Sequence, residues 1–415
     1  MFIERIKVSN FKSFDEIDVQ LRPLNVFVGA NASGKSNFAS VLTFLRDIAV
    51  HGLANAVSMH GGPTYIRNIH IGAAREVRIE VSGRLVERPS WSVLGIKKHL
   101  NFSPSSFEYK LTLKTNRSNE SFSRSRESLR LAHRRVTKSE GEEDIESIYY
   151  LAVEASAKGA DTKWLRSDGS FVDVNDHVPA RMDIPFMPLK KDQSLLELPH
   201  VRYASFDENF GSISSFDIDP KLPMKAFPVT GKAHLEEDCS NLAVVLKQIT
   251  RNPADRRKLI NLLSTLLPFV DDLDVEHVTD RSLVFRLRER GSSSRYLPAY
   301  FLSDGTINIV ALIVCLYFDD DSLLIIEEPE KNIHPYLISN LTELFQESSD
   351  KRQIVITTHS PEIVRSCNID DLFLVTRDAK GFSRVTQPKN NTHLGSFLKN
   401  DIGVADMFVQ DLLGV

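Results

Sequence analysis

The spacing of hydrophobic and polar residues divides the 415-residue chain into three stretches. Up to residue 87 the pattern predicts strands, a glycine-containing loop, a helix and further strands. From residue 88 to 230 no helical period is sustained, and short apolar runs alternate with stretches rich in Ser, Pro and Asp. Beyond residue 230 helical patterns return, and over 304–376 helices alternate with strands. This alternation predicts a largely parallel sheet and an α/β fold.

These three stretches predict one large domain with an insertion, for which the chain is long enough. We expect residues 1–87 and 231–415 to form its two halves. Residues 88–230 would form an inserted, mostly β lobe that carries a mobile basic loop over 115–145. The chain contains no internal repeat and no long heptad array, which excludes a long coiled-coil arm.

Composition and charge narrow the function classes. The chain is 42% hydrophobic and 26% charged with a net charge of −4, so nucleic acid would need a local basic patch. Its three cysteines are far apart and form no metal or disulfide pattern, which fits a reducing compartment. The N-terminus is charged where a signal peptide is apolar, and the longest apolar run, 307–318, is too short to span a bilayer. We therefore expect a cytoplasmic protein without a membrane partner.

The most specific motif follows the apolar run 24–28 and precedes a helical pattern over 37–45. Residues 29–36 match the phosphate-binding loop G-x-x-x-x-G-K-[ST] at every fixed position. Backbone N–H groups of such a loop bind phosphate, its Lys reaches the β- and γ-phosphates, and its Ser binds Mg²⁺. The sequence thus predicts a nucleoside triphosphate, ATP, with Mg²⁺. The expected binding residues are Gly29, Ala30, Asn31, Ala32, Ser33, Gly34, Lys35, Ser36 and Asn37.

Two apolar strands in the last hundred residues end in side chains that suit catalysis. Glu327 and Glu328 end the first, where Glu327 would hold Mg²⁺ and Glu328 would act as general base toward water. A buried strand with two solvated acids at its end explains that pattern equally well. His359 follows the second strand and would contact the γ-phosphate and the water, although a lone His at a strand end is more often structural.

A third feature precedes the apolar helix predicted over 306–318. Ser303 and Gly305 lie at its start, where a helix N-terminus offers a second anion site. Read alone, the segment is a capped helix start, because Ser303 and Asp304 are both good N-cap residues.

Together these motifs resemble the ABC-type ATPase heads of the RecF, SMC and OLD families, and most of all bacterial AAA family ATPases of RecF/OLD type. The resemblance implies a P-loop ABC-type head with a mixed sheet and flanking helices, in which Lys35, Glu328 and His359 are catalytic. It also implies that Lys12, in a turn over 10–14 similar to one in the family, approaches phosphates. The matching segments are 29–36 for Walker A, 302–306 for the signature, 323–328 for Walker B, 329–335 for the D-loop and His359 for the switch histidine.

The chain departs from the family pattern at three points. Walker B ends in Glu-Glu, where many relatives carry Asp-Glu. No Gln lies between Ser36 and Gln193, so the Q-loop glutamine is missing, and His60 lies near its expected place. Too few residues follow His359 for the TOPRIM nuclease domain of OLD proteins. Nuclease chemistry would therefore come from another chain.

The resemblance implies a head-to-tail homodimer, or a higher oligomer, with ATP in its interface. Ser303 and Gly305 of one chain would complete the site of the other, with ATP closing the dimer and hydrolysis opening it. Stand-alone ATPases of this type resemble components of bacterial antiphage and toxin-type operons. We therefore expect an ATPase that gates a nucleic-acid-directed or effector partner, a nuclease or toxin. The alternative is an ATP-switched scaffold or sensor with negligible turnover that sequesters an effector; a transporter ATPase fits less well.

A basic cluster over residues 117–138 suits DNA phosphates. Acidic residues follow it over 140–146, so a solvated, self-paired loop is an equally good interpretation, and only Phe122 offers a ring for base stacking. The C-terminal segment 402–415 is apolar at helical spacing and would pack on the head or offer a docking stripe. The basic residues of the cluster are Arg117, Arg124, Arg126, Arg130, Arg134, Arg135 and Lys138.

Overall fold

In the computed structural model the chain forms two compact units. Unit 1 comprises Met1–Arg22, Ser40–Ser212 and Arg377–Val385, and unit 2 comprises Pro23–Ala39, Ile213–Thr376 and Thr386–Val415. The C-terminal segment 402–415 lies outside the described residues. The structure describes residues 1–85, 91–92, 101–116, 121–139, 142–156, 159–167, 169–170, 187–198, 210–229, 234–291 and 295–388.

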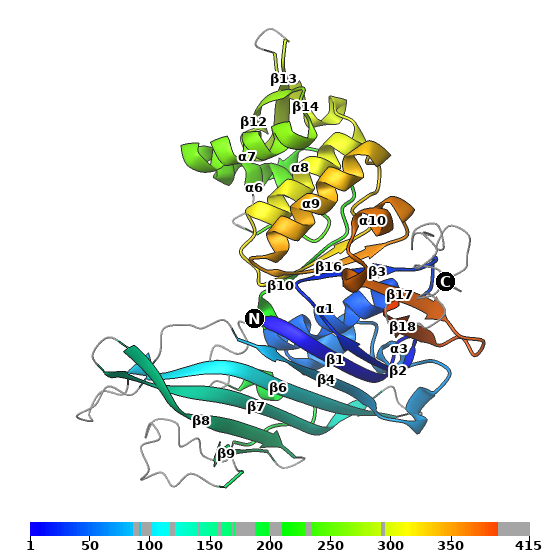
Figure 1. Cartoon of the computed structure of the whole chain (residues 1–415). Coiled ribbons are helices and arrows are strands. Elements are labelled where there is room, and N and C mark those ends of the chain that lie inside the picture. Colours follow the sequence, from blue (N-terminus) through cyan, green and yellow to red (C-terminus); the bar gives the residue numbers. More distant parts are fainter. Residues whose placement is uncertain are drawn as a thin grey trace, which may run out of the picture. The chain divides into compact units, whose positions relative to one another are not determined.

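Unit 2 contains the parallel sheet that the helix–strand alternation predicts. Each neighbouring pair in this part of the sheet is parallel. Nearly every residue of its inner strands is buried, as expected for a parallel sheet whose strands read as continuous apolar runs. The predicted α/β class is confirmed. The strands, in spatial order, are β10 (Ile213–Phe216), β15 (Leu323–Glu327), β16 (Gln353–Thr358), β3 (Leu24–Val28) and β17 (Leu372–Arg377) (Figure 1).

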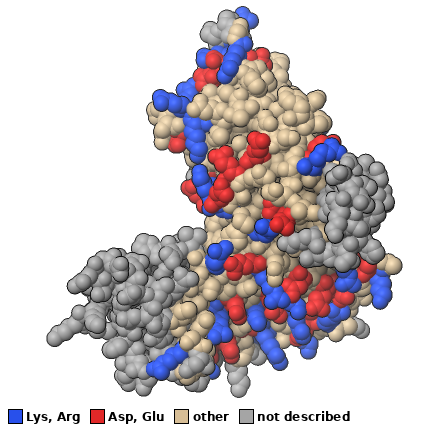
Figure 2. Space-filling model, in the orientation of Figure 1, with Lys and Arg blue, Asp and Glu red and all other residues tan. Residues whose placement is uncertain are grey.

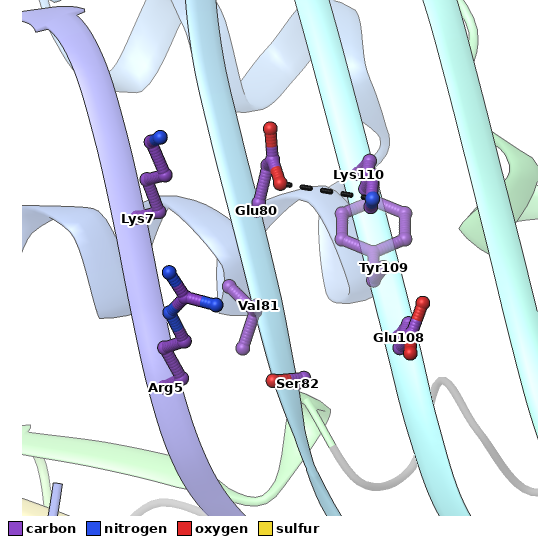
Figure 3. A pocket seen from close by; sticks show the side chains of 8 residues that line it. All are labelled: Arg5, Lys7, Glu80, Val81, Ser82, Glu108, Tyr109 and Lys110. Atoms are coloured by element: carbon purple, nitrogen blue, oxygen red, sulfur yellow. Dashed lines mark ion pairs between the residues drawn. The ribbon is translucent and has the colours of Figure 1, made fainter. Parts of the chain in front are cut away.

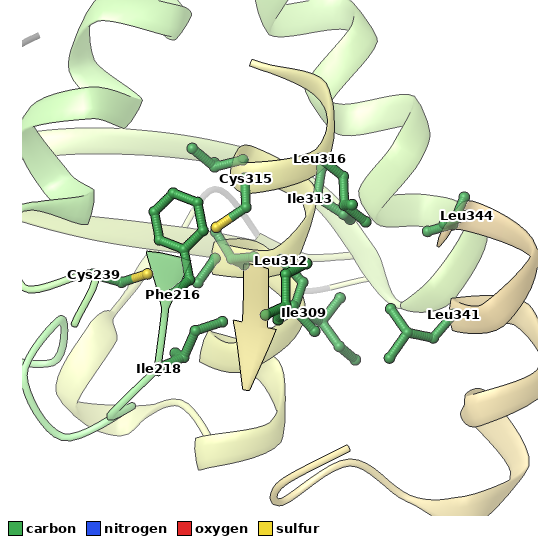
Figure 4. Close-up of a cluster of buried hydrophobic side chains, with 14 of the residues drawn as sticks. Phe216, Ile218, Cys239, Ile309, Leu312, Ile313, Cys315, Leu316, Leu341 and Leu344 are labelled. Carbon is green, nitrogen blue, oxygen red and sulfur yellow. The ribbon is translucent and has the colours of Figure 1, made fainter. Parts of the chain in front are cut away.

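Helices and a second sheet complete unit 2. The helix α8 is buried on nearly all sides, because its residues are apolar around the whole circumference. Its Ile309, Leu312 and Cys315 pack into the main hydrophobic cluster with Phe216 (Figure 4). The helices are α6 (Leu242–Arg251), α7 (Pro253–Leu266), α8 (Asp304–Tyr317), α9 (Ile338–Ser349) and α10 (Pro361–Ser366). The antiparallel second sheet contains β11 (Phe227–Pro228), β12 (Val270–Thr279), β13 (Ser282–Glu289) and β14 (Leu297–Pro298).

Unit 1 is a wide, mostly antiparallel sheet with short helices. Burial alternates along its strands: Val77, Ile79 and Val81 of β4 are buried, while Arg78 between them is exposed. One face is therefore packed and the other faces water. The strands, in spatial order, are β18 (Ser383–Thr386), β2 (Phe14–Gln20), β1 (Phe2–Phe11), β4 (Val77–Arg84), β6 (Asn101–Thr115), β7 (Phe122–Ser139), β8 (Glu142–Ala155) and β9 (Ala160–Arg166), with β5 (Trp91–Ser92) on β6. The helices are α1 (Lys35–His51), which begins in unit 2, α2 (Leu53–Met59) and α3 (Pro63–Ile66).

The prediction of a mobile basic loop over 115–145 is wrong for the residues that the structure describes there, because they lie in paired strands. β7 and β8 pair from Glu127 with Ala155 to Ser139 with Glu142. Leu129 and Leu131 are buried between polar neighbours, a period of two that the sequence analysis interpreted as a polar loop. The expected lobe boundary after residue 87 falls between β4 and β6, which pair along their length. Residues 117–120 and 140–141 lie outside the described residues.

No helix in the described part of the chain is both long enough and apolar enough to cross a membrane.

Candidate functional site

The phosphate-binding loop lies in unit 2 between β3, which ends at Val28, and α1, which begins at Lys35. The strand, loop and helix predicted around residues 29–36 are thus confirmed. A Cβ atom on Gly29 would collide with the Val375 carbonyl oxygen and lie 2.7 Å from Ser33 Oγ. Gly34 has a φ of 118°, which L side chains rarely adopt. Both glycines of the motif are therefore required by the backbone.

The Lys35 side chain is buried inside this loop, where only 6% of the residue is exposed. Its amine donates hydrogen bonds to the carbonyl oxygens of Gly29 (2.8 Å) and Ala30 (3.0 Å). Burial lowers the pKa of Lys35 below its ordinary value, and the charges of Glu328, Glu330 and Glu327 act in the opposite direction. A partly desolvated ammonium that faces carboxylates is ready to bind phosphate oxygens.

Two hard oxygen donors meet at the end of β15. Ser36 Oγ donates a hydrogen bond to Glu327 Oε2 at 2.5 Å. Glu327 lies opposite Thr357 in the parallel register, so β15 and β16 end at the same edge of the sheet. Across the described ranges, no group of three or more His, Cys, Asp or Glu side chains is arranged to hold a metal ion. The hydroxyl and carboxylate pair resembles Mg²⁺ sites that are completed by phosphate oxygens and water.

Glu328 and His359 lie beside this pair. Glu328 Oε1 is 3.3 Å from His359 Nδ1, and Glu328 Oε2 is 3.4 Å from Lys331 Nζ. The backbone at Glu328 has a φ of 45°, a left-handed conformation that is uncommon for a residue with a side chain. Its N–H donates to the Thr357 carbonyl oxygen at 2.8 Å, which holds this turn against the end of β16. The acid and the histidine are therefore oriented toward each other.

The signature segment starts α8 and contacts the turn after Walker B. Ser303 is the N-cap, and its Oγ accepts the Thr306 N–H at 3.2 Å. A Cβ atom on Gly305 would collide with the Asn332 carbonyl oxygen, so only glycine fits. Asn308 Nδ2 donates to the Lys331 carbonyl oxygen at 2.6 Å. The start of α8 is thus fixed to the segment that carries Glu328.

A sequence profile of the family described as "AAA domain, putative AbiEii toxin, Type IV TA system" matches residues 24–365. The chain belongs to this AAA-domain family. It is thereby a member of the P-loop ATPases, and the AAA-family membership expected from its motifs is confirmed.

Curated relatives match short stretches of this AAA-domain protein. The DNA replication and repair protein RecF of Corynebacterium jeikeium is 29% identical over 89 residues, 21% of each chain. RecF of Halalkalibacterium halodurans is 44% identical over 55 residues, 13% of this chain and 15% of RecF. The chain thus matches under a third of these relatives' length.

Solved structures of SMC heads match over most of the chain at low identity. An SMC head bound to the C-winged helix domain of ScpA is 15% identical, with 93% of this chain and 97% of that chain covered and a TM-score of 0.45. The SMC head domain of Thermotoga maritima is 14% identical, with 93% and 99% covered and a TM-score of 0.41.

Two expected features of this AAA-domain protein lie in unit 1. Lys12 has a φ of 46°, and its amine donates to Ser40 Oγ at 2.8 Å, on the α1 turn that follows Ser36. Its contact with phosphate stays a prediction. His60, near the expected place of the Q-loop glutamine, lies with Nε2 2.9 Å from Asp47 Oδ2. Burial raises the pKa of Asp47, but hydrogen bonds from His60 and Arg46 outweigh it and hold that pKa below its usual range.

The described members of the basic cluster do not lie in one patch. Arg124 faces the packed side of β7, where its side chain is 1% exposed and lies 3.7 Å from Glu127. Arg126 is exposed, and Arg130 lies over the Tyr150 ring at 4.1 Å. Arg117 lies outside the described residues, as do the side chains of Arg134, Arg135 and Lys138. Figure 2 shows basic and acidic residues interspersed on this unit.

A pocket of about 160 Å³ lies on the solvent face of unit 1, across β1, β4 and β6 (Figure 3). Its basic side chains and Glu80 already have partners, and Glu108 is exposed to solvent. Arg5 pairs with Asp18, and Lys110 Nζ lies 3.7 Å from Glu80. The pocket therefore offers no unpaired basic group to a ligand among the described pairs, and it differs from the site of unit 2.

Glu330 and Asn308 were not predicted from the sequence as parts of this arrangement. Glu330 accepts hydrogen bonds from Thr358 Oγ1 and from the His359 N–H. Its signal in the sequence was an acid two positions after Glu328, inside a segment assigned only as D-loop. Asn308 was a polar residue in an otherwise apolar helix, a position that typically marks a buried hydrogen bond.

Proposed function

We propose that this protein binds ATP with Mg²⁺, closes into a head-to-tail homodimer around two ATP molecules and hydrolyses them to switch a separate effector. One observation carries the proposal: Ser36, Glu327, Glu328 and His359 come from three distant segments and meet in pairs at 2.5 Å and 3.3 Å. A buried strand with two solvated acids at its end does not need this arrangement. ATP hydrolysis needs each part of it.

In this proposal Lys35 exchanges its hydrogen bonds to the loop carbonyls for β- and γ-phosphate oxygens. Ser36 and Glu327 would hold Mg²⁺, which when bound neutralises phosphate charge. Glu328 accepts the proton of the attacking water, and His359 orients the carboxylate from 3.3 Å away. The exposed Ser303 and the adjacent Gly305 would bind the γ-phosphate held by the second copy.

The effector is proposed from the family. The family description names a toxin of a type IV toxin–antitoxin system, and the chain's own site is suited to nucleotide chemistry. We therefore propose that ATP-driven dimer closure gates a separate toxin or nuclease in the cytoplasm, in genome maintenance or antiphage defence. Direct DNA binding is the weaker proposal, because the described basic residues of β7 are divided between the two faces of the sheet.

Light scattering after size exclusion tests the dimer. We expect the mass to double with ATP–Mg²⁺, the doubled mass to persist in Glu328→Gln, and Lys35→Ala to stay monomeric. Ser303→Arg blocks only the signature, so it too should stay monomeric while it still binds ATP. An equal mixture of Lys35→Ala and Ser303→Arg should recover partial dimer formation, because one composite site stays intact. A mass that does not respond to ATP would overturn the proposal and favour a constitutive scaffold.

A further inference from the structure

Glu330 is a buried acid beside the site for which the proposed hydrolysis has no role. Its side chain is 8% exposed. Its Oε1 accepts hydrogen bonds from Thr358 Oγ1 at 2.5 Å and from the His359 N–H at 3.2 Å. Its Oε2 is buried and has no hydrogen-bond partner among the residues that the structure describes. A buried carboxylate that is satisfied on one side only costs free energy, so packing alone does not account for it.

The two groups that Glu330 binds define the position of His359. Thr358 is the last residue of β16, and His359 is the first residue beyond the sheet. From there its imidazole Nδ1 lies 3.3 Å from Glu328 Oε1 and 3.9 Å from Glu330 Oε1. Half of the His359 side chain is exposed, so packing contributes little to its orientation. The hydrogen bonds that Glu330 accepts from Thr358 and from the His359 N–H hold the backbone at His359.

The turn that carries Glu330 is itself held in place. Lys331 N–H donates to the Glu328 carbonyl oxygen at 3.0 Å, which closes the turn. Asn332 has a φ of 60°, and its carbonyl oxygen lies where a Cβ on Gly305 would collide with it. Asn308 on α8 binds the Lys331 carbonyl oxygen from the other side. Glu330 therefore extends from a rigid turn, fixed to the signature helix, toward the histidine.

We infer that Glu330 is a positioning residue that holds His359 in the orientation in which its imidazole faces Glu328. This inference rests on the proposed ATP hydrolysis at the same site. Removing the carboxylate lowers kcat through His359 and leaves the hydrogen bonds of Lys35 within the phosphate loop in place, so ATP binding changes little. Glutamine retains the function in part, because its amide oxygen accepts the hydrogen bonds from Thr358 and His359.

Steady-state ATP hydrolysis in single and double variants tests this pathway. Glu330→Ala should lower kcat about 10- to 100-fold, the usual effect of a misplaced reacting group, with the Kd for ATP changed less than about twofold. Glu330→Gln should recover most of the loss, and Thr358→Val should reproduce part of it. In Glu330→Ala/His359→Ala, kcat should equal that of His359→Ala. If the kcat of the double variant instead falls by the product of the two single losses, the inference is overturned. The control is Glu343→Ala, an exposed acid on α9.

Hydrogen–deuterium exchange separates this inference from the proposed function. The His359 amide should exchange faster in Glu330→Ala than in wild type, while Glu330→Gln and Glu343→Ala should match wild type. This measurement needs no ATP turnover. If wild type does not hydrolyse ATP but exchange rises as expected, only the proposed function fails. If exchange at 356–360 is unchanged in folded Glu330→Ala, the positioning role is overturned whatever the ATPase rate.

Discussion

The two units of the molecule are both built on β-sheet, yet the candidate chemistry lies in only one of them. In unit 2 the inner strands are parallel and buried at nearly every residue. In unit 1 the strands are mostly antiparallel and alternate between buried and exposed residues. A parallel sheet brings the carboxyl ends of its strands to one edge. Chain segments that are far apart in sequence can meet at that edge. An antiparallel sheet with one solvent-exposed face does not bring the carboxyl ends of its strands together in this way.

The same residue types therefore act differently in the two units. Glu80 of unit 1 lies opposite Lys110 on the next strand, and the pair faces water. Glu327 and Glu328 of unit 2 end a buried strand, beside a lysine inside a glycine loop and a histidine. Acids paired across a wet face neutralise neighbouring charges. Acids at the edge of a parallel sheet are available for a ligand.

The largest expected effect compares these two kinds of acid directly. Glu328→Gln should lower ATP turnover at least about 100-fold, because general base catalysis contributes that much or more. Glu80→Gln should leave turnover within about twofold of wild type, because its partner Lys110 faces solvent. Phosphate release at saturating ATP measures both. Comparable losses in the two variants would mean that the position of the acid does not decide its role.

The second prediction concerns a buried acid inside unit 1. Glu127 is fully buried and accepts hydrogen bonds from Tyr109 Oη (2.6 Å), Ser194 Oγ (2.5 Å) and the Leu195 N–H (2.8 Å). Arg124 Nη1 lies 3.7 Å from Glu127 Oε2. Burial raises the pKa of Glu127 above its ordinary value. Glu127→Ala should cost about 3–5 kcal/mol of unfolding free energy, because it leaves the buried Arg124 without its carboxylate partner, although Arg124 still donates to the Ser156 and Lys190 carbonyl oxygens.

Urea unfolding measures this loss, and the exposed Glu108 supplies the control. Glu108→Ala should change the unfolding free energy by less than about 0.5 kcal/mol. Where Glu127→Ala is too unstable to isolate, Ser194→Ala removes one hydrogen bond to the acid and should cost about 1–2 kcal/mol. A loss no larger than that of the Glu108 control would show that the buried cluster does not stabilise the unit.

The placement of the candidate site residues of unit 2 was easier to predict from the sequence than the sheet of unit 1, for a physical reason. The phosphate loop, Glu327, Glu328 and His359 each follow a continuous apolar run, so the end of a buried strand was visible in the pattern. The strand β7 carries serines and arginines on its wet face, and this period of two was interpreted as a loop. Contacts such as that of Glu330 with Thr358 depend on how the chain turns after a strand, which spacing does not encode.

A third prediction uses pH on a buried acid of unit 2. Burial raises the pKa of Asp319 from an ordinary 3.8 to about 6. Between these values the folded state binds more protons than the unfolded state, so the unfolding free energy falls as pH rises from about 4 to about 6. The full effect is about 3 kcal/mol at 1.36 kcal/mol per pKa unit. Well above pH 6, where Asp319 is ionised in the folded state, the whole loss of unfolding free energy is present.

Asp319→Asn tests this linkage, because its amide oxygen still accepts the Asp321 N–H. The variant should gain about 1–3 kcal/mol over wild type at pH 7.5, and this difference should shrink as pH falls toward 4. Urea unfolding at several pH values measures the difference in unfolding free energy between Asp319→Asn and wild type. The contributions of the other titrating groups cancel in this difference, because both proteins contain them. A difference that is constant with pH would mean that Asp319 titrates normally in the folded protein.

The smallest expected effects compare two surface lysines, one from each unit. Lys110 pairs with Glu80 at 3.7 Å, and Lys331 pairs with Asp217 at 3.0 Å; both pairs are largely open to solvent. Such pairs contribute about 0–1 kcal/mol, so neither Lys→Ala variant should change the unfolding free energy by more than that.

The two Lys→Ala variants should differ in ATP turnover. Lys331 Nζ also lies 3.4 Å from Glu328 Oε2, so Lys331→Ala removes a charge beside the proposed base and should change kcat a few-fold. Lys110→Ala should not change kcat, and 0.5 M salt should not reproduce the Lys331→Ala effect, because that contact is partly buried. Equal kcat values in the two variants would show that the charge of Lys331 does not affect the proposed base Glu328, and that Lys331, like Lys110, has no part in turnover.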